Sequence, residues 1–375
     1  MPWEPLGAYV MGKALDVAAA KMEPKVRVFA ERLRSRWNRP IAERHLRLNG
    51  PELVTFYSSD SPFLVRIADE EFVLPARIET PATAGGGLTT QALRFRIVDR
   101  GFSLDPSLDD YRASIHEEAK RDKRLFDGRV VRMCELSPTG IATLCHASYF
   151  DALATNFAMD HAPPGRAETL RQAVHHASRS VGDLRTSKLV NHLGLVCMVE
   201  SADGMLVAQQ RASAVANRAN TISSSVSGAV NLSDVRPFMD RETGLLELAH
   251  AVFREALEEL GVEAHTIRFL GLLRELLRGG KPELYFYART ASSIRAIVTA
   301  RASAEGRKET KAVQGFEFHS ERVGTDDGSR FAFQERVRQV LKQTDRRANF
   351  TFVAGTLLSA NHVLQSSAHT SREPR

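Results

Sequence analysis

Residues 254–262 place one arginine and three glutamates inside an apolar helical pattern. At about 100° per residue, Glu255, Glu258 and Glu259 fall within an arc of roughly 100° on one helix face. Carboxylates gathered in this way repel each other, and a cation among them relieves the repulsion. Hard divalent ions such as Mg²⁺ take oxygen ligands of this kind, together with substrate phosphates. The stretch therefore predicts a metal-binding helix face, whereas the plainer interpretation is a solvated acidic surface.

The spacing of the glutamates permits two metal positions. Glu255 and Glu259 lie four residues apart, so both side chains could hold one ion. Glu258 lies three residues after Glu255 and could bridge to a second ion. Metal ions neutralise charge on phosphate oxygens and lower the pKa of water, and carboxylates position the ions and accept protons. These residue types suit the hydrolysis of a diphosphate.

The same stretch resembles the second half of the Nudix box, G-x5-E-x7-R-E-U-x-E-E-x-G-U, in which U is a bulky aliphatic residue. The residues that carry the match are Arg254, Glu255, Leu257 (one place later than the first U), Glu258, Glu259, Gly261 and Val262. The resemblance implies Mg²⁺- or Mn²⁺-dependent hydrolysis of a nucleoside diphosphate linked to another moiety. It also implies that Arg254 orients a carboxylate and that Gly261 forms the turn after the helix.

The resemblance implies separate roles for these charged residues. Glu258 and Glu259 are the implied metal ligands, and Glu255 is a ligand or a general base. The backbone carbonyl of Gly228 is a further implied ligand. The candidate catalytic residues are Arg254, Glu255 and Glu258, and the candidate metal ligands are Gly228, Glu255, Glu258 and Glu259.

The first half of the box departs from the family pattern. Counting back from Arg254 leads to Leu246 and Asp240, where the pattern has a glutamate and a glycine. One repair uses Glu247, which lies seven residues before Arg254 and so shares its helix face. In this interpretation, Glu247 pairs with the guanidinium.

The other repair is an insertion, and it is the one we favour. Gly228 and Asp234 form a G-x5-D opening, preceded by a short strand and glycine turn at 222–230. Residues 235–246 are then inserted, and their proline, glycine and acidic residues predict a loop. The altered opening leaves two functions: an active hydrolase, or a Nudix-fold module that binds a nucleotide without cleaving it.

A second, shorter resemblance concerns the residues before the box. A predicted strand pair at 130–145 leads into Tyr149, Asp151 and the pair Thr155-Asn156. This order is similar to the region before the box in nucleotide-sugar pyrophosphatases of the UDP-glucose type. It implies a nucleotide sugar as the substrate, whereas the plainer interpretation is a helix N-terminus.

Composition indicates an ordinary globular protein. The chain has 375 residues, of which 43% are hydrophobic and 26% charged, with a net charge of +6. This mild positive charge suits polyphosphate ligands. Residues 25–47 are basic, but their apolar spacing favours an amphipathic solvated helix over a nucleic-acid-binding element.

Cysteine usage and hydropathy indicate the compartment. Three cysteines without paired metal spacing are typical of free, buried thiols in a reducing environment. No run of about 18 apolar residues predicts a membrane helix, and the N-terminus does not resemble a signal peptide. We therefore expect a cytoplasmic protein that does not contact membranes.

The order of the predicted elements favours an α/β fold. We expect an α+β accessory domain at 1–165, a Nudix α/β/α sandwich with a mixed sheet at 186–364, and a disordered tail at 365–375. Arg211 ends the second strand of the opening hairpin and is a candidate substrate-binding residue; a surface arginine is the alternative. The predicted strands are 53–57, 63–67, 93–98, 130–136, 140–145, 191–200, 205–211, 267–273, 284–289 and 313–319, and the predicted helices are 111–124, 169–178, 248–260, 291–302 and 331–341.

Overall fold

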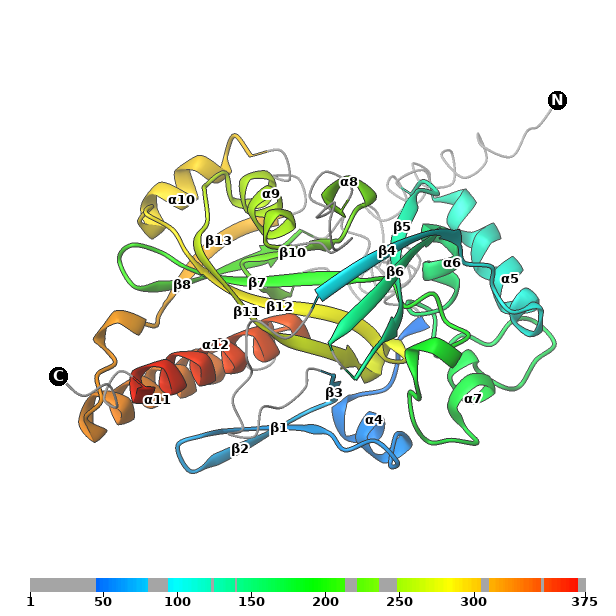
Figure 1. The fold of residues 1–375 in the computed structure, drawn as a ribbon, viewed down its shortest axis with the longest axis horizontal. Coiled ribbons are helices and arrows are strands. Elements are labelled where there is room, and N and C mark those ends of the chain that lie inside the picture. The colour runs from blue at the N-terminus through cyan, green and yellow to red at the C-terminus, as the bar shows by residue number, and fades with distance from the viewer. Residues whose placement is uncertain are drawn as a thin grey trace, which may run out of the picture. The chain divides into compact units, whose positions relative to one another are not determined.

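The computed structural model describes eight stretches of the chain (Figure 1). Contacts between residues divide the chain at Pro40, and residues 41–375 form one compact unit. Most of the basic segment 25–47, nearly all of the expected insertion and Glu247 lie outside the described residues. Among the described residues, no helix has both the length and the apolar character needed to cross a membrane. The described stretches are 45–79, 94–122, 125–138, 140–212, 221–235, 248–304, 310–344 and 347–369.

The main sheet is mixed, with the strand order β13-β8-β7-β12-β11-β3. Strand β7 runs parallel to β12 and antiparallel to β10. Strands β7 and β8 pair only at Glu200 and Leu206. Beyond that point β9 pairs with β8 and β10 pairs with β7. The strands are β3 (Ala76–Ile78), β7 (Gly194–Glu200), β8 (Met205–Arg211), β9 (Ile222–Ser223), β10 (Val226–Ala229), β11 (His265–Glu275), β12 (Lys281–Arg289) and β13 (Thr310–Glu317).

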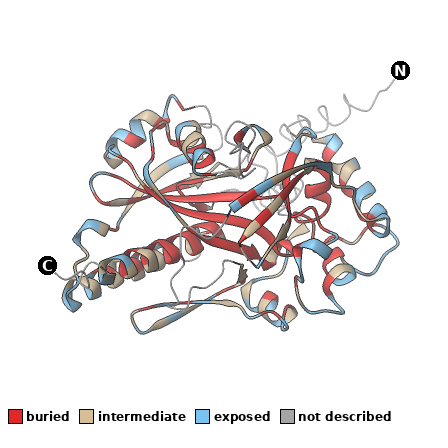
Figure 2. Ribbon diagram, viewed as in Figure 1, coloured by how far each residue is buried: buried red, intermediate tan, exposed pale blue. Residues whose placement is uncertain are grey.

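Two apolar cores cover the two faces of this sheet. Side chains alternate along a strand, so Leu195 and Cys197 of β7 join one core while Val196 and Met198 join the other. The first core contains residues of α9 and α10, and the second contains residues of α11 and α12. The strands between these layers are mostly buried (Figure 2). This confirms the expected α/β/α sandwich with a mixed sheet.

Three of the four helices in the two outer layers were predicted from the sequence. The predicted helices 248–260, 291–302 and 331–341 correspond to α9, α10 and α11, whereas α12 was not predicted. Helix α12 extends to His369, past the expected start of the tail at residue 365. The helices are α9 (Ala249–Leu260), α10 (Ile294–Arg301), α11 (Asp327–Thr344) and α12 (Phe350–His369).

A smaller sheet has the strand order β4-β6-β5, and its strands precede β7 in the chain. The predicted hairpin is present, because β5 and β6 pair antiparallel. Val131 and Met133 of β5 pack into the same core as α9. Helix α8 contacts β5 as well, so this small sheet supports α8. The elements are β4 (Arg94–Gly101), β5 (Arg129–Leu136), β6 (Ile141–Ser148), α5 (Asp109–Arg121), α6 (Tyr149–Ala154) and α8 (Leu232–Val235).

The predicted strand at 53–57 is wrong, because residues 53–56 belong to helix α4 and Tyr57 caps its C-terminus. Asn49 and Glu52 form a capping box, in which each side chain accepts a hydrogen bond from the other's backbone N–H. Pro51 fits the first turn, where its missing N–H is not needed. The remaining elements are α4 (Gly50–Phe56), β1 (Phe63–Ile67), β2 (Glu70–Leu74), α7 (Leu170–His175) and the 3₁₀ turns Pro106–Leu108, Leu184–Thr186, Leu276–Arg278 and Ser320–Arg322.

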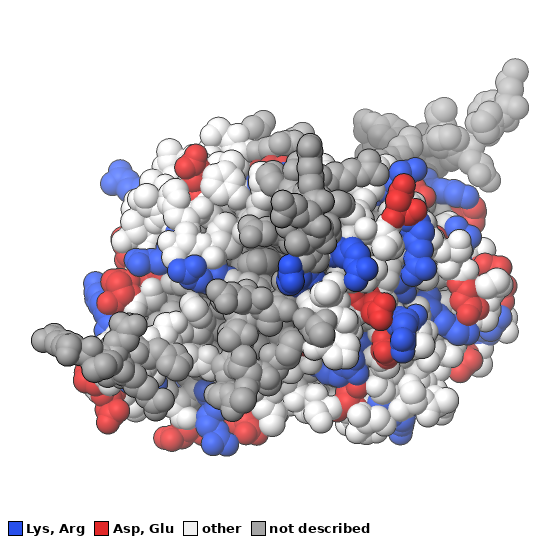
Figure 3. Space-filling view, in the orientation of Figure 1, with Lys and Arg blue, Asp and Glu red and all other residues white. Residues whose placement is uncertain are grey.

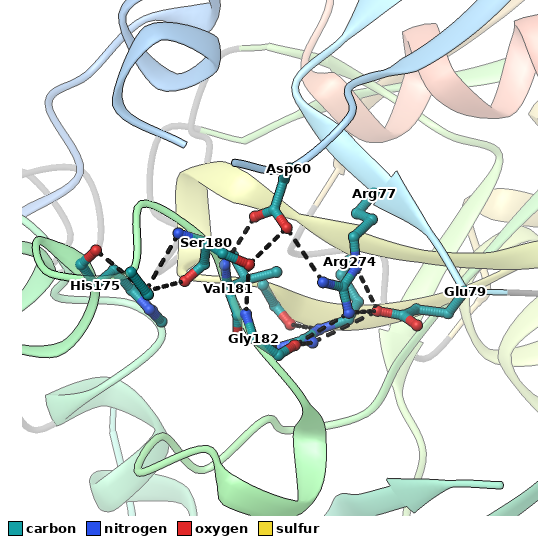
Figure 4. Close-up of polar contacts among 10 residues, drawn as sticks. Asp60, Arg77, Glu79, His175, Ser180, Val181, Gly182 and Arg274 are labelled. Atoms are coloured by element: carbon teal, nitrogen blue, oxygen red, sulfur yellow. Dashed lines mark hydrogen bonds and ion pairs between the residues drawn. The ribbon is translucent and has the colours of Figure 1, made fainter. Parts of the chain in front are cut away.

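A polar network joins the segment after α4 to the main sheet (Figure 4). The Asp60 carboxylate accepts hydrogen bonds from the Val181 backbone N–H at 2.7 Å and from the Ser180 hydroxyl at 2.7 Å. The Arg77 guanidinium lies 3.2 Å from the same carboxylate. From β11, Arg274 donates to the backbone oxygen of Val181 at 3.2 Å. The loop around residue 181 is therefore held from two directions.

Surface charges of both signs are mixed on the face drawn in Figure 3, where Lys and Arg side chains lie among Asp and Glu side chains. The net charge of +6 is thus not gathered into a single positive area among the described residues of that face. Local contacts, more than overall charge, decide what a site here can bind.

Candidate active site

Helix α9 carries the acidic stretch, and Gly261 ends it. Gly261 adopts a left-handed conformation with φ 71°, and its N–H donates to the Leu257 carbonyl. A Cβ at this position would lie 2.9 Å from the backbone oxygen of Ala300. Glycine is thus required both by the backbone conformation and by the close approach of α10. The predicted turn after the helix is present.

Arg254 pairs with the acid of the favoured opening. Its guanidinium binds the Asp234 carboxylate through two contacts, Nε–Oδ1 at 2.6 Å and Nη2–Oδ2 at 2.9 Å. The same group contacts Glu255 Oε1 at 2.9 Å and Glu258 Oε2 at 2.7 Å. Forked arginine–carboxylate pairs are strong and fix orientation. Asp234 on α8, twenty residues before Arg254, thus joins the glycine loop to the acidic helix.

Glu255 is a buried carboxyl group packed against Gly228. Glu255 as a whole is 8% exposed. A Cβ on Gly228 would lie 2.2 Å from Glu255 Oε1, so only glycine leaves room for this carboxylate. Burial raises the pKa of Glu255 to about 7, and the nearby charge of Arg254 opposes that rise. Glu255 can therefore change its protonation state near neutral pH, which a general base requires.

Glu259 of α9 is oriented by one residue of β8 and one residue of β10. Its Oε2 accepts a hydrogen bond from Gln209 Nε2 at 2.7 Å and from the Ser227 backbone N–H at 3.1 Å. Gln209 in turn donates to the Ser225 carbonyl at 2.6 Å, and its Oε1 accepts from the Thr310 hydroxyl. Sequence reasoning missed Gln209. The signal that could have found it is its place two residues before Arg211 on the same strand.

The two remaining predicted residues are Glu258 and Arg211. The Glu258 side chain is 37% exposed and contacts Arg254. Arg211 ends β8, where its N–H donates to the Thr221 carbonyl at 2.9 Å. Val207 of the same strand packs into the core beneath α9, and alternation places Gln209 and Arg211 on that face too. Arg211 therefore lies on the α9 side of the sheet.

The segment with the weaker resemblance uses its polar side chains within the fold. The Asp151 carboxylate binds Arg112 at 2.7 Å and His116 at 3.0 Å. The Thr155 hydroxyl donates to the Asp151 carbonyl at 2.8 Å. Asn156 Oδ1 accepts from the Asn191 N–H at 2.7 Å. These contacts explain the residues as supports of α6 and of the loop before β7.

The donor types around Gly228 fit a hard divalent cation, because they are carboxylate and backbone oxygens. No group of three acidic, histidine or cysteine side chains in the described part of the chain has the arrangement of a metal site. In this structure Arg254 supplies the positive charge to Asp234, Glu255 and Glu258. The set of ligands expected from the sequence, Glu255, Glu258, Glu259 and the Gly228 backbone, therefore stays a prediction.

Comparison with known proteins adds little to this geometry. No protein-family model and no curated protein matches the chain. Among solved structures, the DR0079 protein of Deinococcus radiodurans is similar at 14% identity over 44% of this chain and 80% of its own, with a TM-score of 0.28. A MutT protein of Methanosarcina mazei Go1 is similar at 16% identity over 40% and 95%, with a TM-score of 0.23. The Nudix hydrolase RenU of M. smegmatis is similar at 12% identity over 41% and 88%, with a TM-score of 0.21. Likeness at this level carries no conclusion, so the site itself must support any function.

Proposed function

We propose that this chain hydrolyses a nucleoside diphosphate linked to another moiety, using Mg²⁺ or Mn²⁺, as a Nudix-type hydrolase. The observation that carries the proposal is the forked pair between Arg254 and Asp234. It explains the altered opening of the box, because an aspartate on α8 takes the place of the expected glutamate. A solvated acidic surface would not need either of two features found here. The Asp234 carboxylate that pairs with Arg254 is buried, and Gly228 packs directly against Glu255.

Each residue has a role in this proposal. A bound divalent ion would neutralise phosphate oxygens and lower the pKa of the attacking water. Glu258 and Glu259 would hold the ion, and Gln209 keeps one oxygen of Glu259 in place. Glu255 would accept the proton from water, a task that its pKa of about 7 suits. Arg254 keeps Glu255 and Glu258 in position, and Arg211 would bind a phosphate or the moiety attached to it.

Product release from a panel of substrates tests the proposal. The panel contains nucleotide sugars, dinucleotides and nucleoside triphosphates, each with Mg²⁺ and with Mn²⁺. The Glu259→Gln variant should keep its fold and lose turnover by at least about 100-fold, since a ligand to the ion is removed. Glu263→Gln, three positions beyond the end of α9 and exposed, is the matched control and should keep full turnover. Unchanged turnover in Glu259→Gln would overturn the assignment.

The second candidate function is nucleotide binding without cleavage. One observation favours it: Arg254 already pairs with Asp234, Glu255 and Glu258, so the carboxylates have a positive partner without a metal ion. Calorimetric titration of the same panel distinguishes the two functions. Binding with no turnover on any compound would identify a sensor, whereas turnover would identify the hydrolase.

A further inference from the structure

Two cysteines from neighbouring strands lie in contact, away from α9. The Sγ atoms of Cys134 and Cys145 are 2.6 Å apart. This separation lies well inside the roughly 3.5–4.0 Å of ordinary heavy-atom contact and slightly beyond the roughly 2.05 Å of a disulfide bond. Both residues are free thiols in this structure. Neither side chain belongs to the site around Arg254.

The strand register explains why the sulfur atoms meet. Arg132 faces Cys145 and Met133 faces Leu144, but the next pair is Glu135 with Thr143. Cys134 is therefore the extra residue of a β-bulge, which bends its strand and re-aims its side chain. Alternation along β5 turns Cys134 away from the core that holds Met133. Cys134 lies two residues after Arg132, the residue that faces Cys145, and the bulge brings its sulfur atom into contact with that of Cys145.

The surroundings of the pair favour a reactive thiolate on one side. The hydrogen bond with Cys145 lowers the pKa of Cys134; burial opposes this shift, and the positive charge of Arg132 adds to it. The third cysteine, Cys197, has no such neighbour, and burial raises its pKa. All three cysteines are buried, and only Cys134 and Cys145 lie in contact with a second thiol.

We propose that Cys134 and Cys145 form an intramolecular disulfide that joins β5 to β6 when the chain meets a peroxide. In the first step the Cys134 thiolate attacks one peroxide oxygen, the O–O bond breaks, and the leaving hydroxide takes a proton to become water. In the second step Cys145 loses its proton and its sulfur attacks Cys134 Sγ. The S–O bond breaks and a second water leaves. Two thiols lose two electrons in total, and hydrogen peroxide is reduced to two waters.

Thiol counting on the full-length protein tests the proposal. The protein is treated with hydrogen peroxide, denatured, alkylated with N-ethylmaleimide and weighed by mass spectrometry. Before treatment it should carry three adducts, one for each cysteine. After treatment it should carry one, and tris(2-carboxyethyl)phosphine should restore all three. A non-reducing peptide map should link the peptide of Cys134 to that of Cys145.

Variants of the third cysteine and of the pair sharpen the result. Cys197→Ser should still lose two thiols, because the pair is intact, whereas Cys134→Ser should form no internal link. The wild-type peptide map and Cys197→Ser decide the matter even where Cys134→Ser does not fold. Three adducts after peroxide, a link to Cys197, or a disulfide between two chains would each overturn the proposal.

Discussion

At the scale of single residues, the contact between Gly228 and Glu255 is the most demanding feature of the site. A carboxylate that is 8% exposed sits where a side chain on residue 228 would otherwise be. The loop and the helix can approach this closely only because glycine has no Cβ. The position of Glu255, and with it the proposed proton transfer, depends on one missing methyl group.

We predict that Gly228→Ala lowers turnover by at least about 10-fold and lowers the free energy of unfolding by about 1–3 kcal/mol, the usual cost of overpacking. The added Cβ would lie 2.4 Å from the Glu255 carboxyl carbon and would force that group aside. Turnover on the active substrate and urea denaturation measure the two effects. Gly50→Ala is the matched control, because its Cβ would meet only Pro75 at 3.9 Å. Equal behaviour of the two variants would contradict the prediction.

The part of this site that lies within one helix could be predicted from the sequence. The residues of one helix turn have fixed angular positions, so Arg254, Glu255 and Glu258 could be placed together. The choice of Asp234 over Glu247 could only be proposed, because it depends on how a loop returns to the helix. The contact of Gln209 with Glu259 could not be predicted, since it joins residues fifty positions apart; the sequence places Gln209 only on the same strand face as Arg211.

At the scale of elements, the same distinction separates correct predictions from wrong ones. The strands 191–200, 205–211 and 284–289 could be predicted because their sequences are strongly apolar and rich in β-formers. Residues 53–57 are equally rich in β-formers, but the capping box at Asn49 and Glu52 begins a helix before them. Strand β3 is only three residues long and exists because it pairs with β11. No local pattern predicts such a pairing.

The network in Figure 4 leads to a prediction about these elements. Asp60→Ala should lower the free energy of unfolding by about 3 kcal/mol, because it leaves the Val181 N–H and the Ser180 hydroxyl without this acceptor and removes one of the two carboxylates that bind Arg77, the other being Glu79. Urea denaturation measures the loss. The surface pair of Arg66 with Glu71 offers the control, since both side chains are substantially exposed. Glu71→Ala should cost little, and a similarly small loss for Asp60→Ala would contradict the prediction.

At the scale of the whole molecule, several histidines are buried where a positive charge is costly. Burial lowers the pKa of His161 and of His175 to about 4, and it lowers the pKa of His192 well below the usual value. Each of these rings is neutral in the folded protein near neutral pH. The unfolded chain binds protons at these positions more readily than the folded chain does. The fold as a whole should therefore weaken in mild acid.

His175 allows a direct measurement of this effect. The ring is 4% exposed, packs on the Tyr57 ring at 5.5 Å, and its Nε2 has no hydrogen-bond partner. The charges of Arg171 and Arg274 add to burial in lowering its pKa.

We predict that His175→Phe reduces the loss of stability between pH 7 and pH 5. A histidine whose pKa is lower in the folded state keeps its full contribution above about pH 6.5, the unfolded value, and loses it as the pH falls toward 4. At pH 5 that loss amounts to about 2 kcal/mol, so urea denaturation of the variant should lose about 2 kcal/mol less than wild type over this range. His176→Phe, at the exposed neighbouring position, should keep the wild-type pH dependence. If both variants follow the wild-type curve, another group sets the acid sensitivity of the fold.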